Sequence, residues 1–132
     1  MTLKIRLYGA FSLCWDGGER VNVTSAKQRA LLAMLATAPE GRRTRAWLQE
    51  ALWPRSGPVN GRASLRRALS DLRTLFGDRF ETAFDVTNSD ITLRPEAISI
   101  VGSPSEGAFL EGIVIREKGF EDWLQSQRRK AA

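Results

Sequence analysis

The stretch NGRASLRRALSDLRTLF, residues 60–76, decides the fold that the sequence predicts. Its apolar residues recur at helical spacing and form one stripe made of Leu65, Ala68, Leu69, Leu72 and Phe76. The remaining surface is polar and mostly basic, with Arg66, Arg67, Ser70 and Thr74 opposite the stripe and Arg62 and Arg73 at one flank. The stretch is therefore predicted to be an amphipathic helix. Packing against a core needs no arginine-rich outer face, so the arginines indicate a partner with negative charge.

Basic charge is concentrated in and before this helix. Residues 42–73 contain eight arginines and only two acids, Glu50 and Asp71, so the segment has a net charge of +6. The whole chain of 132 residues has a net charge of +5 and a sequence pI of about 10.1. The basic excess thus lies within one segment, and a phosphate backbone with guanine edges fits such a face. Double-stranded DNA is the expected partner.

Composition excludes most enzyme chemistry. Histidine is absent, which removes the commonest general base and metal ligand. Cys14 is the only cysteine, so neither an intramolecular disulfide nor a thiolate metal site is available. The glycine-rich phosphate-binding motifs GxGxxG and GxxxxGK(S/T) are both absent. The adjacent acids Glu121 and Asp122 are interpreted as part of a solvated helix face, because neighbouring helical residues point in different directions. We expect no catalytic residue, no metal, no cofactor and no small-molecule substrate.

The sequence also indicates the compartment. No segment is long and apolar enough to span a membrane, and residues 1–11 alternate like a strand and lack the apolar core of a signal peptide. A single cysteine is typical of a reducing environment. We therefore expect a cytoplasmic protein without membrane contact.

The first half of the chain combines strand and helix signals. Apolar residues alternate with polar ones in three segments, which are predicted as strands at residues 3–8, 10–15 and 20–23. Asp16, Gly17 and Gly18 form a hairpin turn signal between the last two. Two helices are predicted next, one capped by Ser25 and one that is capped by Thr44 and ends at Trp53.

The second half begins with the arginine-rich helix, which Asn60 is expected to cap and Gly77 to end. Strands are then predicted at residues 80–87, 91–94 and 97–101, with a turn at 88–90. This order predicts an α+β fold, a winged helix-turn-helix with an N-terminal antiparallel sheet, three helices and a C-terminal β-hairpin wing. We expect this domain to cover residues 1–101, and residues 102–132 to form a linker and a helical tail.

Three stretches resemble one protein family. They are AKQRALLA at residues 26–33, LQEALW at residues 48–53, and RASLRRALSDLR at residues 62–73. In this order and at this spacing they are similar to the DNA-binding domain of the Streptomyces antibiotic regulatory protein (SARP) family, and more broadly to the effector domains of OmpR/PhoB-type response regulators. The resemblance implies a bacterial transcriptional activator that binds direct repeats as two protomers in tandem and recruits RNA polymerase.

The tail adds a second resemblance. Residues 109–112, FLEG, together with FEDWL at 120–124 and Arg128-Arg129, are similar to the start of the bacterial transcriptional activation domain. That helical-repeat domain follows the DNA-binding domain in SARP regulators. We therefore expect the chain to be either a fragment of a longer regulator or an unusually short one.

Eleven residues are the candidates for DNA contact: Arg43, Thr44, Arg45, Arg62, Ser64, Arg66, Arg67, Ser70, Arg73, Asn88 and Arg94. Arg66 and Arg67 are favoured for base edges because they lie opposite the apolar stripe, whereas Arg62 and Arg73 are favoured for phosphates. Residues 43–45 begin a helix, whose free N–H groups favour a phosphate.

Alternatives remain open for several of these positions. Arg73 can pair with an acid of the wing or sheet instead, and Thr44 can act only as a helix cap between solvated arginines. We favour no contact with the DNA backbone for Lys27 and Arg29 at the start of the first helix. Trp47 and Trp53 are expected in the core or at its edge rather than as stacking platforms for single strands.

The predicted wing is acidic. Asp85 and Asp90 flank its turn, and Arg94 is the only base nearby. Residues 78–122 carry ten acids and four bases, a net charge of −6. A minor-groove wing usually inserts Arg or Lys, so we expect this wing to contribute little to DNA binding. The acidic side can instead face a second protomer or RNA polymerase, and the alternative function is a winged-helix protein-interaction module that does not bind DNA.

Overall fold

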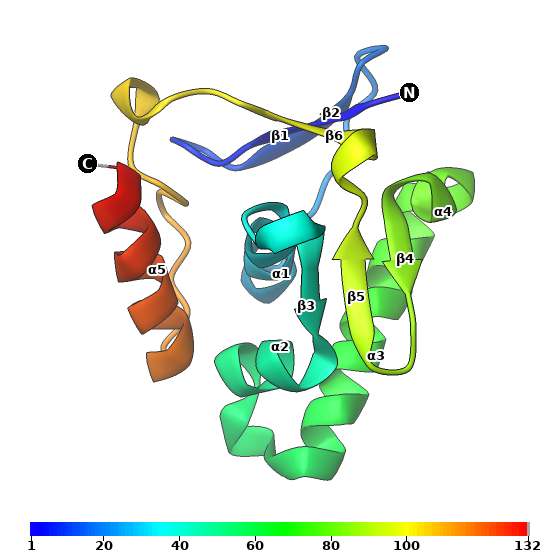
Figure 1. The fold of residues 1–132 in the computed structure, drawn as a ribbon, viewed down its shortest axis with the longest axis vertical. Helices are drawn as coiled ribbons and strands as arrows, with labels where there is room; N and C mark the ends of the chain where they lie inside the picture. The colour runs from blue at the N-terminus through cyan, green and yellow to red at the C-terminus, as the bar shows by residue number, and fades with distance from the viewer. Residues whose placement is uncertain (132) are drawn as a thin grey trace.

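Two three-stranded sheets frame the helices of the chain in the computed structural model, which describes residues 1–131 (Figure 1). The first sheet has the order β2-β1-β6 and contains β1 (Leu3–Arg6), β2 (Ser12–Trp15) and β6 (Ile98–Val101). β1 pairs with β2 in the antiparallel sense and with β6 in the parallel sense. This sheet therefore joins the two ends of the predicted domain.

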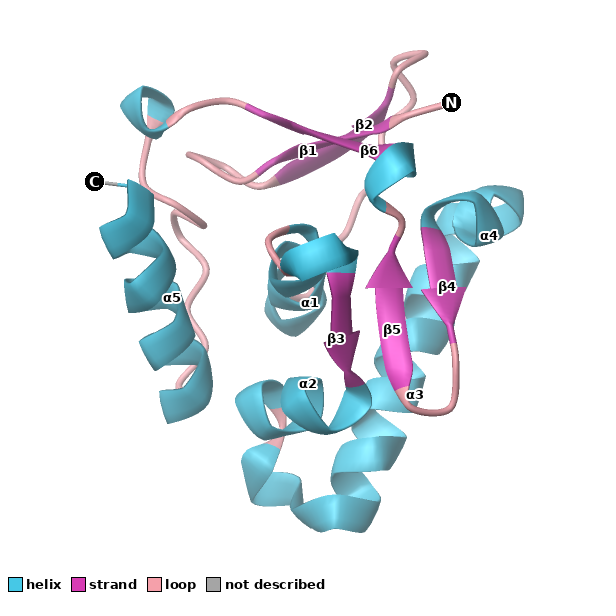
Figure 2. Ribbon diagram, in the orientation of Figure 1, coloured by secondary structure: helices cyan, strands magenta, loops and turns pink. Residues whose placement is uncertain are grey.

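The second sheet has the order β3-β5-β4 and is antiparallel throughout. It contains β3 (Arg42–Thr44), β4 (Phe84–Val86) and β5 (Asp90–Leu93). Thr44 is paired with Asp90, so the end of β3 lies beside the turn of the β4–β5 hairpin. Figure 2 shows β3, β5 and β4 side by side in this order.

The helices are α1 (Ala26–Ala36), α2 (Arg45–Leu52), α3 (Gly57–Phe76), α4 (Phe80–Ala83) and α5 (Lys118–Ala131). The predicted caps of the first two are confirmed. The Ser25 hydroxyl accepts a hydrogen bond from the Gln28 N–H at 3.3 Å, and the Thr44 hydroxyl accepts one from the Trp47 N–H at 3.1 Å. Gly77 ends α3 with a φ of 59°, as predicted.

The core is centred on α1. The six residues from Ala30 to Leu35 are all buried. This part of α1 is apolar on every side, as is typical of a helix that is surrounded by the core. In Figure 1, α1 lies between the β2-β1-β6 sheet above it and α2 and α3 below it. The predicted stripe of α3 is buried in the same core, and so are Leu48 and Leu52 of α2.

The tail packs into this core as well. α5 includes the predicted helical stretch, and its apolar residues Phe120, Trp123 and Leu124 are buried. Glu117, just before α5, forms ion pairs with Arg55 and Lys27: its Oε1 lies 3.1 Å from Arg55 Nε, and its Oε2 lies 3.9 Å from Lys27 Nζ. The tail is thus held against the connection between α2 and α3, while the domain boundary after residue 101 stays a prediction.

The N-terminal sheet differs from its prediction. Residues 20–23 do not form a strand, because only Arg20 bridges to Cys14 across the predicted turn. β6 takes the third place in the sheet, so the sheet is mixed and not antiparallel throughout. Beyond the bridge the Val21 N–H still donates to the Leu13 carbonyl of β2 at 3.1 Å, whereas the Val23 carbonyl accepts a hydrogen bond from Arg29 Nε at 2.6 Å.

The strand prediction for residues 80–87 is wrong in its first half, where the chain forms α4 before β4 begins. Phe76, Phe80 and Phe84 are four residues apart, and a helical turn brings their rings to one side. The Phe80 and Phe84 rings stack with centroids 4.5 Å apart, and the Phe76 ring meets Phe84 edge-on at 5.1 Å.

Two further differences concern α3 and its surroundings. α3 begins at Gly57 with Pro58 in its first turn, so Asn60 lies inside the helix and does not cap it. β3 was not predicted, because residues 42–44 are two arginines and a threonine whose strand character comes from pairing with β5. None of the helices within residues 1–131 combines the length and apolarity that a membrane crossing requires.

We expect Gly41→Ala to destabilise the fold. Gly41 has a φ of 70°, and a Cβ there would overlap the carbonyl oxygen of Leu93 in β5. The substitution should lower the free energy of unfolding by more than about 2 kcal/mol, measured by urea denaturation. Gly17→Ala is the control because a Cβ at Gly17 meets nothing within 4 Å, and it should change stability by less than about 0.5 kcal/mol. Equal effects of the two substitutions would contradict the role given to Gly41.

Candidate nucleic-acid interface

The outer face of α3 is exposed and basic, as its periodicity predicts. Arg62, Arg66, Arg67 and Ser70 are all exposed, while the stripe behind them is buried. Within residues 1–131, Arg62, Arg66 and Arg67 make no ion pair and stack on no aromatic ring. These three guanidinium groups are therefore available to a ligand.

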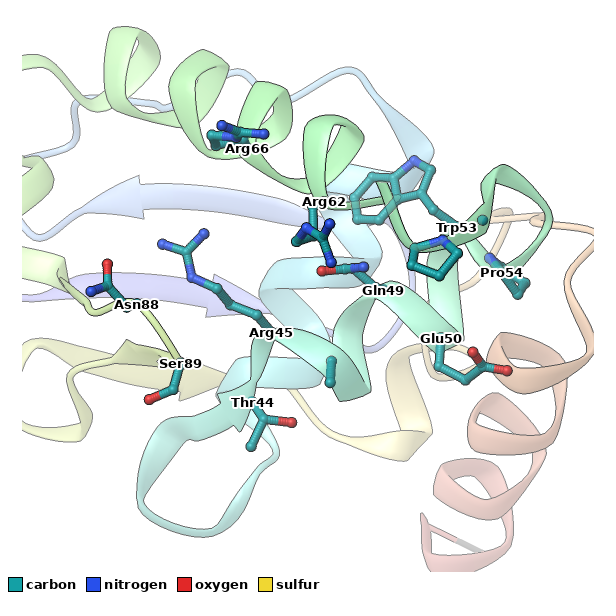
Figure 3. A pocket seen from close by; sticks show the side chains of 13 residues that line it. Thr44, Arg45, Gln49, Glu50, Trp53, Pro54, Arg62, Arg66, Asn88 and Ser89 are labelled. Carbon is teal, nitrogen blue, oxygen red and sulfur yellow. The ribbon is translucent and has the colours of Figure 1, made fainter. Parts of the chain in front are cut away.

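A hollow of about 990 Å³ lies on one flank of α3, between its first turns, the start of α2 and the turn of the β4–β5 hairpin (Figure 3). We call it the α2–α3 hollow. Its polar lining comes from three elements and comprises Thr44, Arg45, Gln49, Glu50, Arg62, Arg66, Asn88 and Ser89. Three arginines against one acid give this hollow a positive character, which favours a phosphate.

Arg45 connects the start of α2 to the hairpin turn. Its backbone N–H donates to the Ser89 carbonyl at 2.8 Å, and its Nε donates to the Thr87 carbonyl at 2.8 Å. Figure 3 shows the Arg45 side chain between α3 and the turn that carries Asn88 and Ser89. The hairpin turn is thus fixed as one wall of the α2–α3 hollow.

A second hollow, of about 340 Å³, lies on the other flank of α3 beside the start of α1. We call it the α1–α3 hollow. Its polar lining comprises Ser25, Lys27, Gln28, Ser64, Arg67 and Asp71. Gln28 Nε2 donates to Asp71 at 3.1 Å, which ties α1 to α3 below this surface. Arg66 and Arg67 are neighbours in sequence but line different hollows, so α3 presents a basic group to each side.

Three of the predicted contact residues lie elsewhere. The Arg43 guanidinium stacks 3.9 Å from the Trp47 ring centroid and is half-buried. The Arg73 guanidinium lies 4.7 Å from the Phe80 ring centroid rather than beside an acid. Arg94 Nε donates to the Glu81 carbonyl at 3.3 Å, at the end of the hairpin away from its turn. Their predicted DNA contacts stay predictions, and each side chain has a structural partner.

Sequence reasoning missed two residues of the interface. Gln49 lines the α2–α3 hollow one helical turn after Arg45, and this spacing was the available signal. Gly61 allows α3 to approach α2 closely, because a Cβ there would lie 3.1 Å from Gln49 Nε2 and 3.4 Å from the Trp53 carbonyl oxygen. Within residues 1–131, no group of three or more His, Cys, Asp or Glu side chains is placed to hold a metal ion.

Comparison with known proteins places this geometry in a structural context. No protein-family model matches the chain, and no curated protein matches it significantly. A solved structure does match: EmbR of Mycobacterium tuberculosis in complex with a low-affinity phosphopeptide, with a TM-score of 0.58 and 28% sequence identity.

This chain is similar to EmbR. The match covers 73% of this chain and 26% of the EmbR chain, so the chain spans about a quarter of the length of that protein. EmbR is a SARP-family transcription regulator, and the likeness supports the relationship that the sequence motifs indicate.

We expect Arg43 to stabilise the fold through Trp47. Arg43→Ala should lower the free energy of unfolding by about 1 kcal/mol, because it removes a half-buried cation–π contact. Arg42→Ala is the matched control, since the Arg42 side chain is exposed and pairs only with exposed Glu40; it should change stability by less than about 0.5 kcal/mol. Urea denaturation followed by circular dichroism measures both, and a loss confined to Arg42→Ala would contradict this assignment.

Proposed function

We propose that this chain is the winged helix-turn-helix DNA-binding part of a transcription regulator. In this assignment α2 and α3 form the helix-turn-helix, α3 enters the major groove, and the β4–β5 hairpin is the wing. The observation that carries the proposal is the arrangement of basic groups around α3. Its exposed arginines face outward, and a polar hollow with a basic lining lies on each flank.

This arrangement fits the dimensions of DNA. An α-helix with its side chains is about 10–12 Å across, and the major groove is about 12 Å wide. A helix in the groove has one phosphate strand on each side. The α2–α3 hollow offers Arg62 to one strand, and the α1–α3 hollow lies on the side of the other strand.

Base contacts are assigned to the outermost side chains of α3. Arg66 and Arg67 are the best placed for guanine edges, where a bidentate arginine discriminates by about 1–3 kcal/mol. Ser64 and Ser70 supply further hydrogen-bonding groups on the same helix. Arg66 and Arg62 both line the α2–α3 hollow, but Arg62 lies at the flank of the apolar stripe and not opposite it, so Arg62 is assigned to a phosphate.

The remaining features of the proposal follow from the SARP relationship. They are binding as two protomers to a direct repeat, recruitment of RNA polymerase, transcriptional activation and action in the cytoplasm. Eight of the ten acids in residues 78–122 are exposed, and a protein partner can contact them. None of these features is needed for DNA binding by a single copy.

A protein-interaction module without DNA binding is the second candidate. It is favoured by the ion pairs of Glu117, which already occupy Arg55 and Lys27 beside the interface. It is opposed by the composition of α3, whose exposed large apolar side chains are only Val59 and Leu75 within residues 57–76 and whose exposed face has no aromatic anchor. Protein interfaces usually depend on such anchors.

The test is selection of bound sequences from a random duplex pool, with the wild-type chain and an Arg66→Ala/Arg67→Ala variant. We expect the wild-type chain to enrich a short motif, and the double variant to lose this enrichment together with about 1–3 kcal/mol of affinity per base contact. Equal enrichment by both proteins would remove α3 from sequence recognition.

The control is an Arg20→Ala/Arg129→Ala variant, which removes the same charge from two exposed arginines outside the two hollows. It should keep the motif and most of the affinity. Weak binding of the wild-type chain to every duplex, without enrichment, would favour the protein-interaction candidate.

A further inference from the structure

The turn of the β4–β5 hairpin is short and closed upon itself. The Thr87 N–H donates to the Asp90 carbonyl at 2.9 Å, and the Thr87 hydroxyl accepts hydrogen bonds from the N–H groups of Asp90 at 3.0 Å and Ser89 at 3.3 Å. Only Asn88 and Ser89 lie between the two bonded ends. The turn therefore presents little chain beyond the sheet with which to enter a groove of DNA.

Arg45 ties this closed turn to α2. Its backbone N–H and its Nε donate to the carbonyls of Ser89 and Thr87, each at 2.8 Å. Thr44 pairs with Asp90 in the adjoining sheet, so the turn is held from two neighbouring positions. The Nε edge of the Arg45 guanidinium group is thus bonded within the protein. A lysine at this position would lack this planar group and its Nε donor.

The charge of the hairpin does not suit the minor groove. Asp85 and Asp90 lie on its strands, and the turn residues 87–89 carry no charge. The Arg94 side chain is bonded to the Glu81 carbonyl at the opposite end of the hairpin. The negative potential of the minor groove attracts arginine and lysine, and the turn has neither. Its one side chain of a type that reads the minor groove is the neutral Asn88.

We propose that Arg45 is a positioning residue, which fixes the turn 87–90 as a wall of the α2–α3 hollow, and that this turn does not recognise the minor groove. Asn88 and Ser89 then face a phosphate at the edge of the major groove. Each protomer recognises sequence through α3 alone. This inference rests on the proposed DNA-binding function.

The positioning role is tested first without DNA. Amide hydrogen exchange at residues 87–90 should be faster by about tenfold in Arg45→Ala than in the wild-type chain, because the Thr87 carbonyl loses its hydrogen bond from Arg45 Nε. Arg62→Ala is the matched control, since Arg62 lines the same hollow and makes no hydrogen bond to the turn. Unchanged exchange in Arg45→Ala, or equal acceleration in both variants, would overturn the positioning role.

The second arm uses the duplex enriched from the random pool. The affinity cost of Arg45→Ala should shrink by severalfold in an Asn88→Ala background, because Arg45 acts through the turn that carries Asn88. Arg45→Lys should recover little of the affinity, although it restores the charge. An equal cost in both backgrounds, or full recovery with lysine, would show a direct contact of Arg45 with DNA and overturn the assignment.

The third arm isolates the minor groove. Replacing G·C by inosine·C pairs, one position at a time, removes the guanine N2 amino group from the minor groove and leaves the major-groove edges unchanged. We expect less than a twofold change in affinity at every position. A change above fivefold at positions beside the α3 contacts would overturn the minor-groove part of the proposal. If no duplex is enriched, the proposed function itself fails, while the exchange experiment still decides how Arg45 holds the turn.

Discussion

The outward display of arginine on α3 depends on the burial of its other face. Leu65, Leu69 and Leu72 lie in a core whose centre is α1, and residues 30–35 of α1 are all buried. Burying one leucine side chain contributes about 1.5–3 kcal/mol, which exceeds what a solvated arginine contributes to the fold. The apolar stripe therefore sets the orientation of α3, and the arginines take the face that remains. The same burial places one hollow on each flank, because α1 and α2 approach α3 from opposite sides of the stripe.

The hairpin is fixed relative to α3 at both of its ends. The rings of Phe76, Phe80 and Phe84 pack together where α3 continues into α4 and β4, and the Arg73 guanidinium covers the ring of Phe80. At the other end, the bonds of Arg45 hold the turn beside the start of α2. These contacts within the protein, without a ligand, hold the turn as one wall of the α2–α3 hollow. A preformed site avoids the conformational cost of ordering a loop on binding.

Local signals predicted those parts of the fold that depend on local interactions. The caps at Ser25 and Thr44 bond to a backbone N–H three residues later, and the burial of α3 follows its own periodicity. Pairing between distant segments was not predictable: β6 displaces residues 20–23 from the first sheet, and β3 is a strand only because β5 lies beside it. The spacing of Phe80 and Phe84 fits both a strand face and a helical turn, and tertiary packing selects the helix. The exposure of Arg62, Arg66 and Arg67 was predicted for the same local reason, whereas the aromatic partners of Arg43 and Arg73 come from the assembled fold.

These partners reduce the number of arginines in residues 42–73 that a ligand can contact freely. Of the eight arginines in residues 42–73, Arg43 and Arg73 lie over aromatic rings, Arg45 bonds to a carbonyl, and Arg42 and Arg55 pair with acids. Only the remaining three, all on α3, have their guanidinium groups free of such partners within residues 1–131. Each phosphate contact adds about 0.9 to the salt dependence of log K for DNA, so a net charge of +6 overstates the electrostatic affinity of one copy. Under the proposed function, a domain with so few free arginines gains affinity when two copies contact each other on neighbouring sites, because the contact makes the second binding event effectively intramolecular without more basic charge in either copy.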